Sequence, residues 1–156
     1  MALGEFQVFN EFAISIGEKK INLETDDIRM ALITDVVTPV ATETTPTWAV
    51  GSSADYDGNE VSGTGYTAGG IALTAPELVL SGAVATFDAT ADLVWSQNGA
   101  GFDNARWGIL YDFDDAAKSC IGFLDLGGDV GNVAGDLTIA FAVGGILTIT
   151  VSDTIA

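Results

Sequence analysis

The sequence predicts a mainly β fold, an antiparallel β-sandwich or jelly roll that begins with a short N-terminal helix or arm. From residue 28 onward, short segments alternate between apolar and polar residues, and clusters of Gly, Asp, Ser and Thr separate them. The segments recur at intervals of roughly 10–15 residues, which is typical of β-sandwiches and jelly rolls. The first residues differ, because their apolar side chains follow a helical spacing.

The helix is expected within residues 5–18. Apolar residues there stand three, four and three positions apart, which places Phe6, Phe9, Ala13 and Ile16 on one helical face. Gly17 could end the helix, because glycine readily adopts the backbone conformation found at helix C-termini. A strand or an extended arm is the alternative, because Phe, Val and Ile also favour strands.

Roughly seven or eight segments are expected to form strands. In the first of them, Ile28, Met30 and Leu32 should share one face, because side chains alternate along a strand. The last two should form a hairpin joined through residues 143–145. The predicted strands are residues 28–34, 71–74, 83–87, 93–95, 106–111, 120–126, 136–141 and 146–151.

Residues 35–70 form a long connection without a clear period. Pro39 and Pro46 lie within it, among many Gly, Ser, Thr and Asp residues. Segments of this length without regular structure are uncommon inside compact domains, and they usually serve a function or act as linkers. We therefore expect an N-terminal helix or arm over residues 1–20 and a single β-sandwich domain over residues 21–156, with the long loop at 35–70.

The chain of 156 residues is strongly acidic, with 22 acids against 5 bases, a net charge of −17 and an isoelectric point near 4.1. Nucleic-acid binding depends on Lys and Arg contacts to phosphates, and anionic membranes also attract basic residues. We therefore predict no nucleic acid and no membrane as partners. The apolar runs are shorter than the roughly 20 residues of a membrane helix, and the acidic N-terminus lacks the basic start of a secretory signal.

No catalytic residue, cofactor or metal site is predicted. Histidine, the commonest general base and metal ligand, is absent from the sequence. The single cysteine, Cys120, stands in an apolar segment and is expected to be a buried core residue rather than a nucleophile. A thiol-based zinc site and an intrachain disulfide are excluded, because the sequence has no second cysteine. The protein is therefore expected to be non-enzymatic.

Two loop motifs resemble known binding sites but lack the required context. Residues 63–68 fit the G-x-G-x-x-A pattern of dinucleotide-binding loops, yet no strand precedes them and no helix follows them. A glycine-rich loop that lies close to another surface is the simpler explanation. Residues 55–60 are acidic, as calcium loops are, but their glycine is misplaced for an EF-hand, so at most a looser carboxylate site remains.

Acidic residues also gather at the ends of two predicted strands. Turns favour Asp, so these residues are expected to lie in solvated turns. An ion site is the first alternative, and an acid–base pair of the kind that glycosidases use is the second. The residues concerned are Asp112, Asp114, Asp115, Asp125 and Asp129.

Aromatic residues of the N-terminal segment and the long loop are candidate interface anchors. Buried aromatic side chains commonly contribute a large share of the binding energy at protein interfaces. Packing onto the protein's own sheet is the alternative for each of them. The candidates are Phe6, Phe9, Phe12, Trp48 and Tyr66.

Six sequence blocks between residues 5 and 150 carry a resemblance to a known family. They are DDIRMALITDVVTPVATETTPTW, NEVSGTGYTAGGIALTAP, ATFDATADLVWSQ, ARWGILYD, IGFLDLGGDV and GDLTIAFAVGGILTIT. In their order and spacing they resemble a family of small acidic virion proteins of tailed bacteriophages. The most specific parts are NEVSGTGYTAGG and the pair ARWGILYD and IGFLDLGGDV.

The resemblance implies a capsid decoration (cement) protein or another head or tail accessory protein. We expect a non-enzymatic structural protein that binds the outer surface of a phage capsid and stabilises the shell. Its expected partners are the major capsid protein and further copies of itself, as a trimer or another homo-oligomer. Residues 1–20 and 35–70 should carry most contacts, because segments that become ordered at a partner surface add contact area.

Two alternatives remain open. The first is a tail-tip or fibre-associated module that binds a host surface glycan or receptor through Trp and Tyr residues of its loops. The second is a carboxylate-dependent glycosidase that uses Asp112, Asp114 and Asp115.

Overall fold

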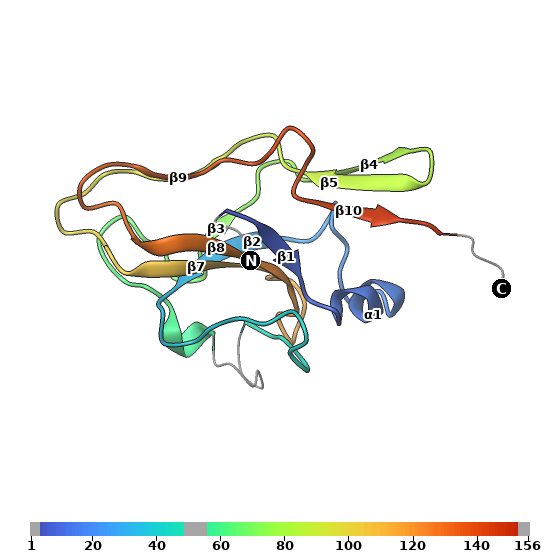
Figure 1. Ribbon diagram of the computed structural model, residues 1–156, viewed down its shortest axis with the longest axis horizontal. Helices are drawn as coiled ribbons and strands as arrows, with labels where there is room; N and C mark the ends of the chain where they lie inside the picture. Colours follow the sequence, from blue (N-terminus) through green and yellow to red (C-terminus); the bar gives the residue numbers. More distant parts are fainter. Residues whose placement is uncertain (1–3, 49–55, 153–156) are drawn as a thin grey trace.

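The computed structural model describes residues 4–48 and 56–152. This part of the chain consists of antiparallel sheets with little helix, so the predicted mainly β, sandwich-like fold is confirmed (Figure 1). The elements in order are β1 (Phe6–Val8), α1 (Phe12–Gly17), β2 (Ile28–Ile33), the short 3-10 helix η1 (Asp57–Asn59), β3 (Ile71–Ala72), β4 (Glu77–Ser81), β5 (Val84–Asp88), β6 (Leu93–Trp95), β7 (Ala105–Asp112), β8 (Cys120–Val130), β9 (Leu137–Ile139) and β10 (Leu147–Thr150).

A five-stranded sheet in the order β1-β8-β7-β2-β3 forms the centre of the fold. The strands β2 and β7 and the first part of β8 bury both of their faces. In β2, Ile28, Met30 and Leu32 belong to one core cluster, as predicted, whereas Ala31 and Ile33 belong to a second cluster on the other face. Strands buried on both faces need apolar residues at nearly every position, which is why these segments are the most apolar of the chain.

Two smaller sheets cover one face of the central sheet. They have the orders β10-β5-β4 and β6-β9, and they form the upper layer in Figure 1. Both contribute large buried side chains to the first core cluster, namely Phe87, Leu93, Trp95 and Leu147. This face-to-face packing gives the fold its sandwich character.

Residues 35–48 and 56–60 of the long loop lie over the opposite face of the central sheet, whereas Val61 and Tyr66 pack against the first core cluster (Figure 1). Trp48 stacks on Tyr111 of β7, with ring centroids 5.0 Å apart and an interplanar angle of 14°. The hydroxyl of Tyr56 donates a hydrogen bond to the buried carboxylate of Glu43. The Trp48 backbone N–H donates to the Lys118 carbonyl at 2.8 Å. The described parts of the loop are therefore docked on the sheet.

The N-terminal segment differs from the predicted helix over residues 5–18. Its first part is the strand β1, which pairs with β8 through Phe6 and Leu124 and through Val8 and Gly122. A side chain at Gly122 would overlap the Gln7 carbonyl, so this glycine lets β1 approach. The helix begins only at Phe12 and ends at Gly17. Pairing with a preformed sheet edge outweighs the local helical period, because it satisfies the backbone of the strand.

The predicted hairpin of residues 136–141 and 146–151 is wrong. β9 pairs with β6, and β10 pairs with β5, so the two segments belong to different sheets. The connection between them turns at Gly145, which has a φ of +85°. The real hairpin of this layer is β4–β5, whose two-residue turn has a φ of +61° at Gly82, as type II′ turns require. The sequence prediction missed β4.

Candidate functional site

The glycine-rich segment of residues 63–70 is a structural loop that lies against the central sheet. A side chain at Gly63 would come within 2.6 Å of the Gly101 carbonyl carbon. Gly70 has a φ of +79°, and a side chain there would overlap the Met30 carbonyl. Both observations confirm the predicted close backbone approach, and they give the glycines a role that needs no nucleotide.

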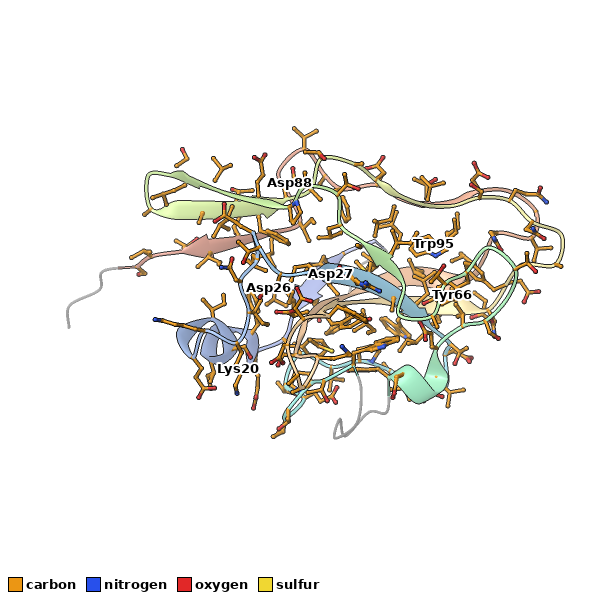
Figure 2. The ribbon with its side chains drawn as sticks, turned by 180° about the vertical axis from the view of Figure 1, so that it is seen from behind. Lys20, Asp26, Asp27, Tyr66, Asp88 and Trp95 are labelled. Carbon is orange, nitrogen blue, oxygen red and sulfur yellow. The ribbon has the colours of Figure 1, made fainter. Side chains whose placement is uncertain are left out.

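Tyr66 fastens this loop to the core. Its hydroxyl donates to Glu60 Oε1 at 2.7 Å and accepts from the Leu32 N–H at 2.9 Å. The ring stacks on Trp95 at 6.5 Å with an interplanar angle of 11°, and Figure 2 shows the two side chains side by side. Burial and the neighbouring Glu60 carboxylate raise the pKa of Tyr66 far above its ordinary value. Tyr66 therefore stays neutral and acts as a structural link.

The five candidate interface anchors pack within the protein. Phe9, Phe12 and Trp48 are buried, and Phe6 and Tyr66 are half-buried against the first core cluster. Their placement agrees with the alternative stated for each of them, packing onto the protein's own sheet. The described surface gives these aromatic side chains little area for a partner.

An acidic cluster, defined as Asp26, Asp27, Asp112, Asp114 and Asp115, forms where β2 begins and β7 ends. Figure 2 shows Asp26 and Asp27 side by side in the segment that leads into β2. Most of the hydrogen bonds that the acidic cluster accepts come from backbone N–H groups. Asp114 Oδ2 accepts from the Asp27 N–H at 2.9 Å, and Asp115 Oδ2 accepts from the Ser119 N–H at 3.0 Å. These two carboxylates cap turns, as the sequence predicts for Asp at strand ends.

Asp112 differs from the solvated turn residue that was predicted, because it is fully buried. Its Oδ1 accepts from the N–H groups of Asp114 and Asp115 at 2.8 and 3.1 Å. Its Oδ2 accepts no hydrogen bond from the described residues, and the carboxylate of Asp26 lies beside it. Burial, strengthened by Asp26, raises the pKa of Asp112 to about 7. Asp112 therefore keeps its proton at pH values at which an exposed aspartate has lost it.

Two cations partly balance the acidic cluster. The Arg29 Nε donates to Asp27 Oδ2 at 2.9 Å, and its guanidinium lies 3.6 Å from the centre of the Phe113 ring. The Lys118 ammonium lies 3.8 Å from the same ring and donates to the Phe113 carbonyl at 2.7 Å. Within residues 4–48 and 56–152, no group of three or more acidic or thiol side chains has the geometry to hold a metal ion.

The remaining acidic candidates have structural partners or lie at the surface. Asp125 forms an ion pair with Arg106, which lowers the pKa of the Asp125 carboxyl. Asp129 is exposed in β8, and Asp57 is exposed in η1. Asp55, the first residue of the possible calcium loop, lies outside the described residues.

Cys120 is buried in the second core cluster, as the sequence predicts. Burial raises the pKa of its thiol well above the ordinary value. A thiol with a raised pKa is a poor nucleophile, because the thiolate is the reactive form. Cys120 therefore acts as a small core residue.

The surface features that the sequence prediction missed are exposed aliphatic side chains. Ile14 of α1 is 56% exposed, and Val36 and Val40 of the long loop are 75% and 51% exposed. On β4, Val79 and Leu80 are 54% and 69% exposed. The segment Leu-Val-Leu between Pro76 and Gly82 is a strand-length apolar run, and this signal could have found β4.

Two pockets adjoin the upper layer. One of about 290 Å³ lies between β4, β10 and the segment after α1, and its lining includes Ile16, Leu78 and the charged residues Lys19 and Glu24. The other, of about 260 Å³, lies between β1, β8 and the connection from β9 to β10, and none of the described residues that line it is charged. Among the described residues, neither pocket is lined by two carboxylates, the pair that glycosidases use.

Comparison of the chain with models of known protein families found no match, and comparisons with curated proteins and with solved structures found none either. No helix in the described part of the chain combines the length and the apolar character that crossing a membrane requires.

Proposed function

We propose that the protein is a non-enzymatic virion structural protein that binds the outer surface of a bacteriophage capsid and stabilises the shell. The sequence blocks that resemble small acidic phage virion proteins motivate this proposal. The net charge of −17 supports the outer surface, because packaged DNA on the inside would repel so acidic a protein.

The main structural support for the proposal is that the long loop is docked on the protein and exposes two aliphatic side chains. Trp48, Tyr56 and Tyr66 hold the loop on the central sheet, while Val36 and Val40 point to solvent. The described parts of the loop, residues 35–48 and 56–70, are already docked and therefore lose little conformational entropy on binding. Exposed aliphatic side chains on such a loop are suited to contact an apolar patch of a capsid subunit. Ile14 offers a similar contact from the N-terminal segment, in keeping with the expected use of residues 1–20 and 35–70.

The chemistry of the described residues supports a role without catalysis. Acid–base catalysis needs paired groups in an accessible cleft, whereas Asp112 is fully buried and Asp114 and Asp115 are bound to backbone groups. Cys120 is buried as a thiol, and the sequence has no histidine. The glycosidase alternative therefore has no support from this geometry.

A binding assay with capsids that lack the protein tests the proposal. The wild-type chain should co-sediment with such shells and raise their thermal stability. Val36→Asp and Val40→Asp should each weaken binding about tenfold or more, because a charge in an apolar contact must be desolvated. Val143→Asp adds the same charge at a fully exposed site in the connection from β9 to β10, and it is the matched control. Failure of the wild-type protein to bind shells would contradict the proposal.

The tail-tip or fibre alternative rested on Trp48 and Tyr66 as a surface for glycans. Trp48 is buried on Tyr111, and Tyr66 is half-buried on Trp95. Sugar binding through these rings needs exposed faces, which this arrangement does not offer.

A further inference from the structure

The strand β4 has an open and apolar outer edge. It is the last strand of the sheet β10-β5-β4, and in Figure 1 it lies at the rim of the upper layer. Among the described residues, its backbone makes hydrogen bonds only with β5. Four of its five residues are exposed, including Val79 at 54% and Leu80 at 69%.

Apart from Glu77 at its start, this edge lacks several of the features by which proteins usually prevent strand pairing. Natural edge strands are commonly protected by Lys, by Pro within the strand, or by a β-bulge. Residues 77–81 contain neither Lys nor Pro, and their pairing with β5 continues without a register shift. An apolar edge with free backbone groups is a template for another strand.

We propose that β4 pairs antiparallel with β4 of a second copy of this chain, about a two-fold axis at Val79. The strand has the sequence Glu-Leu-Val-Leu-Ser, and its central Leu-Val-Leu reads the same from either end, so two antiparallel copies match. Leu78 of one copy lies opposite Leu80 of the other, and the two Val79 residues face each other. Both copies use the same surface, so the contact forms a dimer and leaves no free β4 edge for a third copy.

The position of the acids favours a second copy in this register. Each Glu77, the only charged residue of the strand, faces the uncharged Ser81 of the other copy. The two Glu77 residues then stand about 13 Å apart along the strands, beyond the Debye length of about 8 Å at physiological salt. Asp88 of β5 lies opposite Glu77 in the register of each copy, so it stands at the same end of the sheet as Glu77. A chain with a net charge of −17 can therefore pair here without opposing its acids directly.

The pairing also accounts for the exposed leucine. Within one copy, Leu80 lies beside Ala85 of β5, whereas Leu78 lies beside the buried Phe87. In the dimer, each Leu80 gains Leu78 of the other copy as a neighbour on the same face. The two three-stranded sheets then form one continuous sheet, and the flanks of Val79 and Leu80 that face the other copy are shielded from water.

Disulfide trapping of the full chain tests the register. Val79→Cys should form a disulfide-linked dimer under mild oxidation, because directly opposed residues have Cα atoms about 4.5–5.5 Å apart. Ser81→Cys should form little, because the two introduced cysteines would stand about 13 Å apart. The native Cys120 is buried and does not compete. The proposal would be overturned if Val79→Cys and Ser81→Cys cross-linked equally, or if Val79→Cys formed no cross-linked dimer.

Molar mass in solution is the second test. Light scattering should show a dimer that strengthens with added salt, because salt screens the repulsion between the acidic copies. Leu80→Lys should weaken the dimer about tenfold or more, although it lowers the net negative charge. Val143→Lys makes the same change of charge away from β4 and should leave the dimer intact. A monomer at every salt concentration, a trimer, or equal effects of the two variants would overturn the pairing. The outcome does not depend on where in a phage particle the protein serves.

Discussion

At the scale of single residues, the most unusual group is the buried carboxyl of Asp112. Its Oδ1 is held by two backbone N–H groups, while its Oδ2 has the Asp26 carboxylate as its neighbour. The folded protein therefore holds a proton here at pH values where an unfolded chain has already released it. This makes the stability of the fold sensitive to pH.

Substitution of Asp112 by Asn should remove that sensitivity. The raised pKa means that the free energy of unfolding falls as the pH rises from about 5 to about 8, because the unfolded state binds fewer protons. In Asp112→Asn, the amide can donate to Asp26 at every pH. The decrease in the free energy of unfolding between about pH 5 and pH 8 should therefore be smaller than in the wild type by about 2 kcal/mol. Urea denaturation at several pH values measures the difference. Asp129→Asn, at an exposed position, is the control, and equal pH dependence of wild type and Asp112→Asn would contradict this account.

At the scale of elements, the stacking of Trp48 on Tyr111 is a main contact between the long loop and the central sheet. Trp48 is 4% exposed and stacks on Tyr111, and the strand-like bridge of Thr47 with Ser119 lies next to it. The loop therefore forms part of the second core cluster and should unfold together with the sheet.

Trp48→Ala should destabilise the whole protein by about 3–5 kcal/mol, as large truncations in cores do. Urea denaturation followed by circular dichroism measures this loss. Leu80→Ala serves as the comparison, because Leu80 is exposed and its truncation should cost less than about 1 kcal/mol. If Trp48→Ala kept full stability but lost binding to glycans, the tail alternative would be supported instead.

The elements that could be predicted are those with strong local patterns. The strands β2, β7 and β8 are apolar on both faces, and their segments were predicted within a few residues at most ends. The helical spacing of Phe6 and Phe9 favoured a helix, and the strand β1 corresponds to the alternative, a strand or extended arm, for these residues. The partners of β9 and β10 could not be predicted, because local alternation does not specify which strand pairs with which.

The candidate site could be predicted only in part. The burial of Cys120 follows from its apolar neighbours, whereas the burial of Asp112 depends on the distant Asp26 segment. The exposure of Val36 and Val79 depends on which side chains the fold leaves uncovered. The sequence therefore indicates the fold class better than it indicates which side chains are buried or exposed.

At the scale of the whole molecule, two surfaces stand out on opposite sides of the fold. The long loop, with Val36 and Val40, lies below the central sheet in Figure 1, and the β4 edge lies above it. One surface can therefore contact a shell while the other pairs with a second copy. Such bridging would link neighbouring capsid subunits and stabilise the shell by adding binding energy to the assembled state.

Cryo-EM of phage particles assembled with this chain is the decisive experiment for the proposed capsid binding. We expect density for the protein on the outside of the head, with Val36, Val40 and Ile14 facing the major capsid protein. Absence of the protein from the head, its presence only in the tail, or attachment only through the upper sheets would contradict the account.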